Sequence, residues 1–162
     1  MSFFAFCKWL SETPVSVYLR DAPYPYPILL IIHVISIALF GGMVVMCNLR
    51  VLGVAMKRVP VSQVIEQFRG WKWLAFAILL VTGTLLAMSD PLEYYGNVMF
   101  WISLGLLLAA GVNAAIFRYG VYQSVATWDE AVVTPVSARK WAGVSLSLWI
   151  LLIFAGRAIA FF

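Results

Sequence analysis

The sequence predicts an all-α integral membrane protein, a four-helix bundle in up-down-up-down order with an N-terminal interfacial amphipathic helix. Of its 162 residues, 64% are hydrophobic and 11% are charged, and the mean hydropathy is +0.95. A soluble domain carries about 45–50% apolar and about 25% charged residues, so this charge cannot cover a water-facing surface. Apolar stretches of the length that spans hydrocarbon, about 20 residues, occur four times. They must be helices, because an open sheet would leave unpaired amides in lipid.

Residues 1–26 form the first predicted unit, an N-terminal segment at the membrane interface. It contains Phe3-Phe4-Ala5-Phe6 and Trp9-Leu10, and a second short segment follows Thr13-Pro14 and runs to Arg20. The segment is not expected to be a signal peptide, because a basic region followed by an apolar core and a small-residue cleavage site is missing. Its mixture of aromatic and polar residues favours an amphipathic element that lies on the bilayer surface.

Residues 27–162 form the second predicted unit, the bundle, with spans at about 28–47, 73–88, 98–117 and 141–162. Pro27 opens the first span, because proline is tolerated in the first turn of a helix. Ser89-Asp90-Pro91 stops the second span, and Arg118 ends the third. Small residues four apart, such as Gly83 and Ala87, predict close packing between helices and favour association into an oligomer.

The distribution of lysine and arginine predicts the orientation. Eight of them fall in the two loops on one side of the membrane, and three fall on the side of the termini. The eight are Arg50, Lys57, Arg58, Arg69, Lys72, Arg118, Arg139 and Lys140, and the three are Lys8, Arg20 and Arg157. The positive-inside rule then places both loops in the cytoplasm and both termini outside. The expected partner of this surface is the lipid bilayer and not nucleic acid, because the net charge of +4 is small and scattered.

The two cytoplasmic loops resemble each other. Pro60-Val61-Ser62 precedes the second span and Pro135-Val136-Ser137 precedes the fourth, while Lys72-Trp73 and Lys140-Trp141 mark where the chain enters the membrane. One interpretation is a parallel repeat of two spans about an axis along the membrane normal. The other is coincidence, since the spacing from the proline to the Lys-Trp pair differs.

Two ionisable residues fall inside the predicted spans, where such groups usually have a function. His33, the one histidine, lies about six residues from the outer end of the first span, roughly 9 Å along a helix. Arg157 lies at a similar depth in the fourth span, and Asp90 lies in the short outer loop above both. These depths predict that His33, Arg157 and Asp90 share a pocket in the outer leaflet.

Three interpretations of this pocket remain open. In the first, His33 is an axial ligand of haem b, Met88 or Met99 or a second subunit supplies the other axial ligand, and Arg157, Tyr94 and Tyr95 pair with the propionates. In the second, His33 binds copper together with Met88 or Met99. In the third, His33 only hydrogen-bonds to Ser36 or to the fourth span, and Arg157 extends its side chain to the interface.

No set of residues predicts an enzyme, because the sequence has no Ser/His/Asp set, HExxH motif, phosphate loop or inward carboxylate pair. Asp129-Glu130 and Glu66 are expected to be solvated. The expected function is that of a membrane subunit or accessory protein in which haem b serves electron transfer with a periplasmic redox partner. The alternatives are copper binding or transport through the bundle, and a structural subunit of a larger membrane complex.

Several motifs also carry a resemblance. They are Trp9-Leu10-Ser11-Glu12-Thr13-Pro14, His33, Gly41, Asn48-Leu49-Arg50-Val51-Leu52-Gly53, Thr82-Gly83, Asp90-Pro91, Tyr95, Asn97, Phe100, Asn113 and Phe117. With these the chain, over nearly its whole length, resembles an uncharacterised family of small bacterial four-helix inner-membrane proteins. It is more remotely similar to the membrane part of copper resistance protein D. The resemblance implies an inner-membrane location and places His33 and Arg50 in the family motif. Asn48 and Ser103 depart from it, because the family usually has Asp and often Lys there.

Overall fold

The computed structural model describes residues 3–131 and 133–161. The structure is all-α: it is 85% helical, and the described residues contain no strand. Its helices are α1 (Phe3–Ser11), α2 (Pro14–Asp21), α3 (Pro25–Val51), α4 (Val61–Ser89), α5 (Pro91–Gly96), α6 (Val98–Tyr119), η1 (Val121–Thr127), α7 (Val136–Ala158) and η2 (Ile159–Phe161). Within the described residues, α3, α4, α6 continued by η1, and α7 continued by η2 are long and apolar enough to cross a membrane. The prediction of an all-α chain with four helices long and apolar enough to span a membrane is therefore confirmed, and these helices fit a multi-pass membrane protein.

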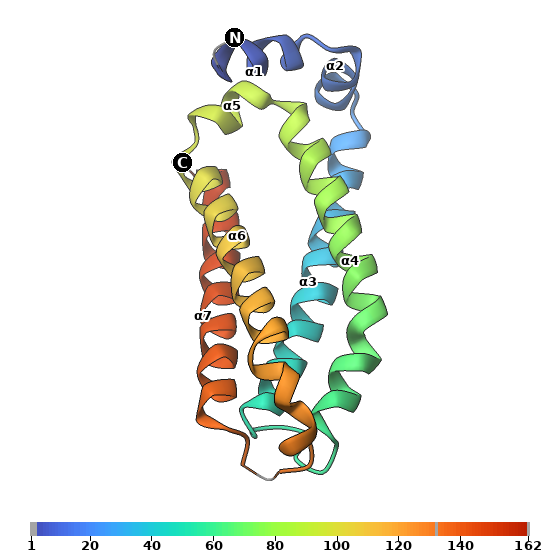
Figure 1. Cartoon of the computed structure of the whole chain (residues 1–162). Helices are drawn as coiled ribbons and strands as arrows, with labels where there is room; N and C mark the ends of the chain where they lie inside the picture. The colour runs from blue at the N-terminus through green and yellow to red at the C-terminus, as the bar shows by residue number, and fades with distance from the viewer. Residues whose placement is uncertain (1–2, 132, 162) are drawn as a thin grey trace.

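The four long helices form two antiparallel hairpins. Helix α3 packs along α4, α6 packs along α7, and α3 contacts α7. Figure 1 shows the hairpins close together at the end that holds the α3–α4 loop and η1, and apart at the end that holds α5 and both termini. We call these the loop end and the termini end.

Helix α4 begins at Val61, twelve residues before the predicted span that starts at 73. The additional turns are amphipathic: Val61 and Val64 are buried, whereas Glu66 and Arg69 are exposed. Charged residues such as Glu66 and Arg69 therefore limit the apolar span, but the helix extends beyond them to Val61. Helix α7 likewise begins at Val136, before the predicted start at 141, and residue 162 at the end of that prediction lies outside the described residues.

The two Pro-Val-Ser sequences adopt the same backbone conformation. Pro60 has φ −53° and ψ 142°, Pro135 has φ −53° and ψ 144°, and a helix begins at the valine that follows each. Proline suits this position because its ring fixes φ and the helix start needs no intrahelical N–H donor there. The two motifs are thus equivalent helix starts.

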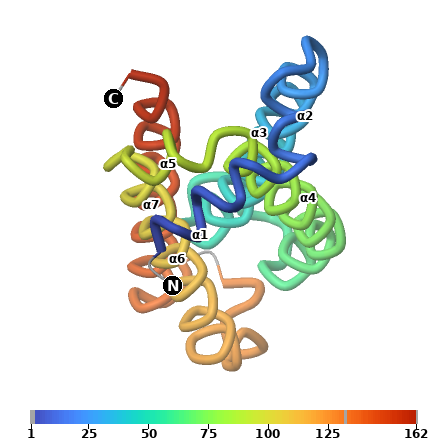
Figure 2. Tube along the Cα trace, turned by 90° about the horizontal axis from the view of Figure 1, so that it is seen from above, coloured from blue at the N-terminus to red at the C-terminus, as the bar shows by residue number. Residues whose placement is uncertain are grey.

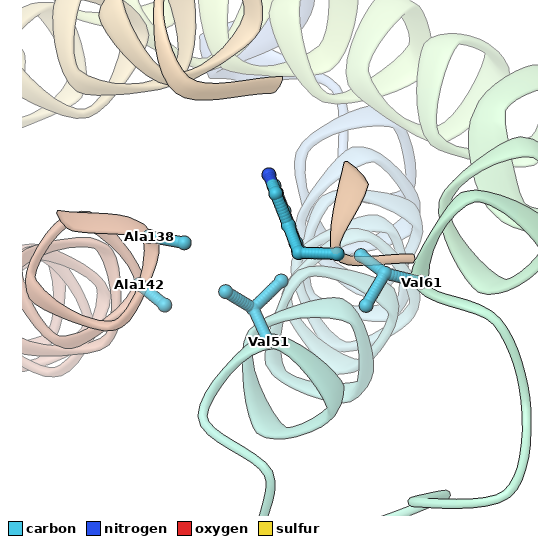
Figure 3. Packing of buried hydrophobic residues seen from close by; sticks show 5 residues of the cluster. Val51, Val61, Ala138 and Ala142 are labelled. Carbon is cyan, nitrogen blue, oxygen red and sulfur yellow. The ribbon is translucent and has the colours of Figure 1, made fainter. Parts of the chain in front are cut away.

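An apolar cluster joins the hairpins at the loop end. It contains Val51, Val61, Trp128, Ala138 and Ala142. In Figure 3, Val51, Val61, Ala138 and Ala142 converge from α3, α4 and α7. These side chains are at most 6% exposed, and burying them stabilises the contact between the hairpins by the hydrophobic effect.

Arg50 and Asp129 add polar contacts around this cluster. Arg50 is 1% exposed, and its guanidinium donates to the carbonyls of Val59 (2.6 Å) and Asp129 (3.2 Å). The Asp129 carboxylate accepts from the backbone N–H (2.7 Å) and hydroxyl (2.6 Å) of Ser62. The prediction that Asp129 is solvated is therefore wrong: its carboxylate accepts from the N–H of Ser62 at the start of α4, a donor that has no partner within the helix. The hydroxyl of Thr134 donates to the carbonyl of Val51.

The spacing of small residues predicted close helix contacts, which the structure lacks at most of the glycines concerned. A Cβ added to Gly111, Gly143 or Gly156 would meet no atom within 4 Å, apart from neighbours in its own helix. Gly83 is different, because a Cβ there would lie 3.1 Å from Cε1 of His33. The absence of a side chain at Gly83 thus makes room for a ring and not for a helix backbone.

Helices α1 and α2 lie across the termini end. Helix α2 packs on α3 and α4, and α1 packs on α5. Figure 2, seen from above, shows α1 running from the α3–α4 hairpin toward α6. Phe3 lies against Tyr95 and Trp101, with ring centroids 5.7 Å and 5.8 Å apart. The N-terminal segment therefore contacts both hairpins at the end where they diverge.

Candidate functional site

His33 lies between the two helices of the first hairpin. Its Nδ1 is 2.8 Å from the hydroxyl oxygen of Thr82 on α4. That hydroxyl is in turn 2.8 Å from the carbonyl of Ile78, to which it donates its single hydrogen. The Thr82 oxygen is then an acceptor, so Nδ1 of His33 carries the proton. In a neutral imidazole, Nε2 consequently keeps a free lone pair.

One further contact fixes the ring: Gly83 leaves the space that the ring edge fills. Any other residue at Gly83 would place its Cβ against Cε1 at 3.1 Å, closer than most carbon atoms approach. One turn of α4 thus holds the ring, and the lone pair of Nε2 is available to ligate a metal.

Ser36 is not the partner of His33. The Ser36 hydroxyl donates to the carbonyl of Ile32, one turn earlier in its own helix, at 2.8 Å. The third interpretation named Ser36 or the fourth span as the partner, whereas the partner is Thr82 on the second. Sequence reasoning missed Thr82 because a serine or threonine in a span commonly bonds only to its own helix. The adjacent Thr82-Gly83 pair was the available signal.

Arg157 is not brought to His33. It is exposed, and its guanidinium carbon lies 4.9 Å above the ring of Phe161. Among the described residues, no hydrogen bond or ion pair joins Arg157 to His33. The two residues lie on different hairpins, which diverge toward the termini end (Figure 1). Asp90 accepts from the N–H of Glu93 at 3.2 Å and thereby caps α5.

The two loop tyrosines have separate surroundings. Tyr94 hydrogen-bonds to Tyr26 at the start of α3, and its ring centroid is 5.3 Å from that of Phe100. Burial, followed by the hydrogen bond and charge of Tyr26, raises the pKa of the Tyr94 hydroxyl well above its ordinary value. Tyr95 instead packs on Phe3 of α1. Tyr94 therefore ties α5 to α3, while Tyr95 anchors the N-terminal segment.

The predicted methionine ligands lie on two different helices. Met88 and Met99 are both half-buried, Met88 near the end of α4 and Met99 at the start of α6. Met88 is five residues beyond Gly83, roughly 7.5 Å further along the helix than the His33 ring. No group of three or more His, Cys, Asp or Glu side chains that could hold a metal ion occurs in the described part of the chain. His33 is then the residue that offers nitrogen to a metal or haem.

A second candidate site is a cavity of about 710 Å³ between the hairpins, toward the loop end. Asn48 lies in its wall and donates to the hydroxyl of Ser145 at 2.9 Å, which links α3 to α7. Asn113 from α6 and Lys72 from α4 also line it. Sequence reasoning did not predict this cavity, because its walls come from four helices whose relative rotation no single span reveals.

In the described residues, four long apolar helices pair in two hairpins, which fits a multi-pass α-helical membrane protein, and His33 lies within one of the hairpins. The chain belongs to a family of unknown function, DUF6644, whose family model matches residues 26–162. This confirms the predicted membership in an uncharacterised family. The comparison with curated proteins and that with solved structures found no match, so the similarity to copper resistance protein D stays a prediction.

Proposed function

We propose that this protein is a bacterial inner-membrane subunit that holds haem b through His33 and passes electrons to or from a periplasmic partner. The observation that supports this proposal is the hydrogen bond from Nδ1 of His33 to Thr82. Histidines that ligate metals almost always donate their other ring N–H to an oxygen, which fixes the tautomer and orients the ligating nitrogen.

A haem with two axial ligands needs a second ligand in addition to His33. Met88 lies further along α4 than the ring, and Met99 lies on the other hairpin. We therefore favour His33 of a second copy, which would make the protein a homo-oligomer with haem between subunits. Arg157 is exposed near the termini end and is the cation available to a propionate.

The proposal includes an arrangement in the membrane. The four long helices would cross as an up-down-up-down bundle, with α1 and α2 lying in the outer interface and both termini in the periplasm. The excess of lysine and arginine at the loop end supports this orientation. We propose no catalytic role, because the function is to hold a cofactor and exchange electrons.

A visible spectrum tests the proposal. The protein is purified in mild detergent from cells supplied with a haem precursor, and spectra are recorded before and after reduction. We expect a Soret band that disappears in His33→Ala. Thr82→Val should weaken haem affinity about 10- to 100-fold, because removing the group that accepts the other ring N–H of a ligating histidine has effects of this size. Thr84→Val is the matched control, since Thr84 is exposed and bonds only to Leu80 of its own helix.

Other outcomes overturn the haem proposal and select an alternative. Absence of a Soret band together with copper that is lost in His33→Ala would select copper binding or transport. Absence of both, with other membrane proteins co-purifying, would select a structural subunit of a larger complex. A Soret band that survives in His33→Ala would exclude His33 as the ligand.

A further inference from the structure

The cavity between the hairpins has an apolar inner wall. The ring of Phe40 on α3 lies 5.4 Å from that of Phe76 on α4 and 5.2 Å from that of Trp149 on α7, measured between centroids. All three rings line the cavity. Its volume of about 710 Å³ falls in the range of ligand sites, about 300–1,000 Å³. This part of the cavity suits an alkyl chain.

Three cations line the same cavity: Arg69 and Lys72 from α4, and Arg118 from α6. Glu66 pairs with Arg69 at 3.2 Å and approaches Arg118 at 4.0 Å on the exposed side. The Lys72 ammonium lies 3.6 Å from the Cys47 thiol, a weak acceptor, and pairs with no carboxylate among the described residues. The cavity thus carries an excess of positive charge beside its apolar wall.

Asn113 provides a third, independent observation. The residue is 6% exposed and lines the cavity, and its amide nitrogen donates to the carbonyl of Trp141 at 3.4 Å. That carbonyl fixes which end of the amide carries nitrogen. The amide oxygen is buried and meets no donor in the described part of the chain. Buried oxygens are rarely left unpaired, so a ligand hydroxyl is the expected partner.

From these observations we propose that the cavity binds an acidic phospholipid whose headgroup carries a hydroxyl, of the phosphatidylglycerol class. The phosphate would pair with Lys72, Arg69 and Arg118, because cations bind phosphate through charge-assisted hydrogen bonds. The headgroup hydroxyl would donate to Asn113, and one acyl chain would lie along Phe40, Phe76 and Trp149. This site is separate from His33 and does not depend on haem binding.

The position of the cavity favours a membrane lipid over a free anion. Lys72 stands directly before Trp73, and both residues line the cavity together with Trp141. Tryptophan gathers at the level of the lipid headgroups, so the cations lie where a phosphate is already concentrated. Basic pockets between membrane helices on the cytoplasmic side bind acidic headgroups in this way.

Native mass spectrometry of the full chain tests the proposal. The protein in detergent is equilibrated with equal amounts of phosphatidylglycerol and phosphatidylcholine, and the lipid retained on it is measured. We expect about tenfold more phosphatidylglycerol, the ratio that one charge-assisted contact supports. Lys72→Gln should remove most of this preference and Lys72→Arg should keep it. Lys140→Gln is the matched control, since Lys140 precedes Trp141 as Lys72 precedes Trp73 but is exposed outside the cavity.

A second comparison tests the headgroup hydroxyl through its proposed partner, Asn113. Wild-type protein should prefer phosphatidylglycerol to phosphatidic acid, which lacks the second glycerol, and Asn113→Leu should abolish that preference while keeping the preference over phosphatidylcholine. His33→Ala should change neither result, so the lipid site and the haem site fail independently. Equal retention of phosphatidylcholine, or an equal effect of Lys140→Gln, would overturn the proposal. Displacement of the lipid by inorganic phosphate at similar concentration would show that the site binds a free anion. That result would also overturn the proposal.

Discussion

Thr82 connects two membrane helices through one hydrogen bond to His33. Replacing it with valine keeps the shape of the side chain and removes the acceptor. We expect Thr82→Val to lower the free energy of unfolding by about 1 kcal/mol, the net value of one such bond. Thermal unfolding in detergent, followed by circular dichroism, measures this. Thr84→Val should leave stability nearly unchanged, because the Thr84 hydroxyl bonds only within its own turn. Equal losses in the two variants would contradict the assigned role.

The raised pKa of Tyr94 predicts that the stability of the protein decreases at alkaline pH. Because burial and Tyr26 raise the pKa of its hydroxyl above the ordinary 10.0, the folded protein keeps a proton that the unfolded chain releases. The corresponding stability is present below pH 10 and is lost as the pH rises above it. We expect the melting temperature of Tyr94→Phe to fall less than that of the wild type above pH 10. Tyr24→Phe, at a tyrosine that is 74% exposed, should follow the wild type.

At the scale of elements, Arg50 joins the α3–α4 loop to the segment before α7. Its guanidinium donates to the carbonyls of Val59 and Asp129. Arg50→Met would remove the donor to Val59 and leave the Asp129 carbonyl with the N–H of Val61 alone. We expect a loss of about 2 kcal/mol in the free energy of unfolding, since one unpaired buried group costs about 1–3 kcal/mol. The control is Arg58→Met, an exposed arginine of the same loop. Similar melting temperatures for the two variants would show that the contacts of Arg50 add no stability.

The sequence predicts the individual helices better than it predicts the contacts between them. Apolar length is a property of one segment, so all four long helices were predictable from composition. The start of α4 was not, because Val61 is buried by packing in a cluster with Trp128 and Ala138, which lie far away along the chain. The position of a residue along a span predicts its depth, as it did for His33 and Arg157. It does not predict the direction in which the side chain points around the helix axis. The partner of His33 therefore turned out to be Thr82, and Arg157 lies over Phe161.

For the whole molecule, the excess of lysine and arginine at the loop end predicts a topology. A reporter that is active only in the periplasm, fused after the C-terminus, should be active, and the same reporter inserted after Arg58 in the α3–α4 loop should be inactive. A reporter that fluoresces only in the cytoplasm should give the opposite pattern. The reverse result for both reporters would contradict the proposed orientation and would move the acidic-lipid site to the outer leaflet.

The family match and the packing divide the chain differently. The match begins at residue 26, within the first turn of α3, and so omits α1 and α2. Those two helices nevertheless contact both hairpins, through α4 and through Tyr95 and Trp101. A boundary drawn from family similarity would therefore cut through a packed part of the molecule.

The same contacts determine an order of assembly. A ribosome makes α1 and α2 before any span, but α2 packs on α4 and Phe3 packs on Trp101 of α6. Helix α1 can therefore reach its final position only after α6, which carries Trp101, has been made. The contacts of α1 and α2 with both hairpins are thus completed only after α6 has been made, although these two helices precede every span in the chain.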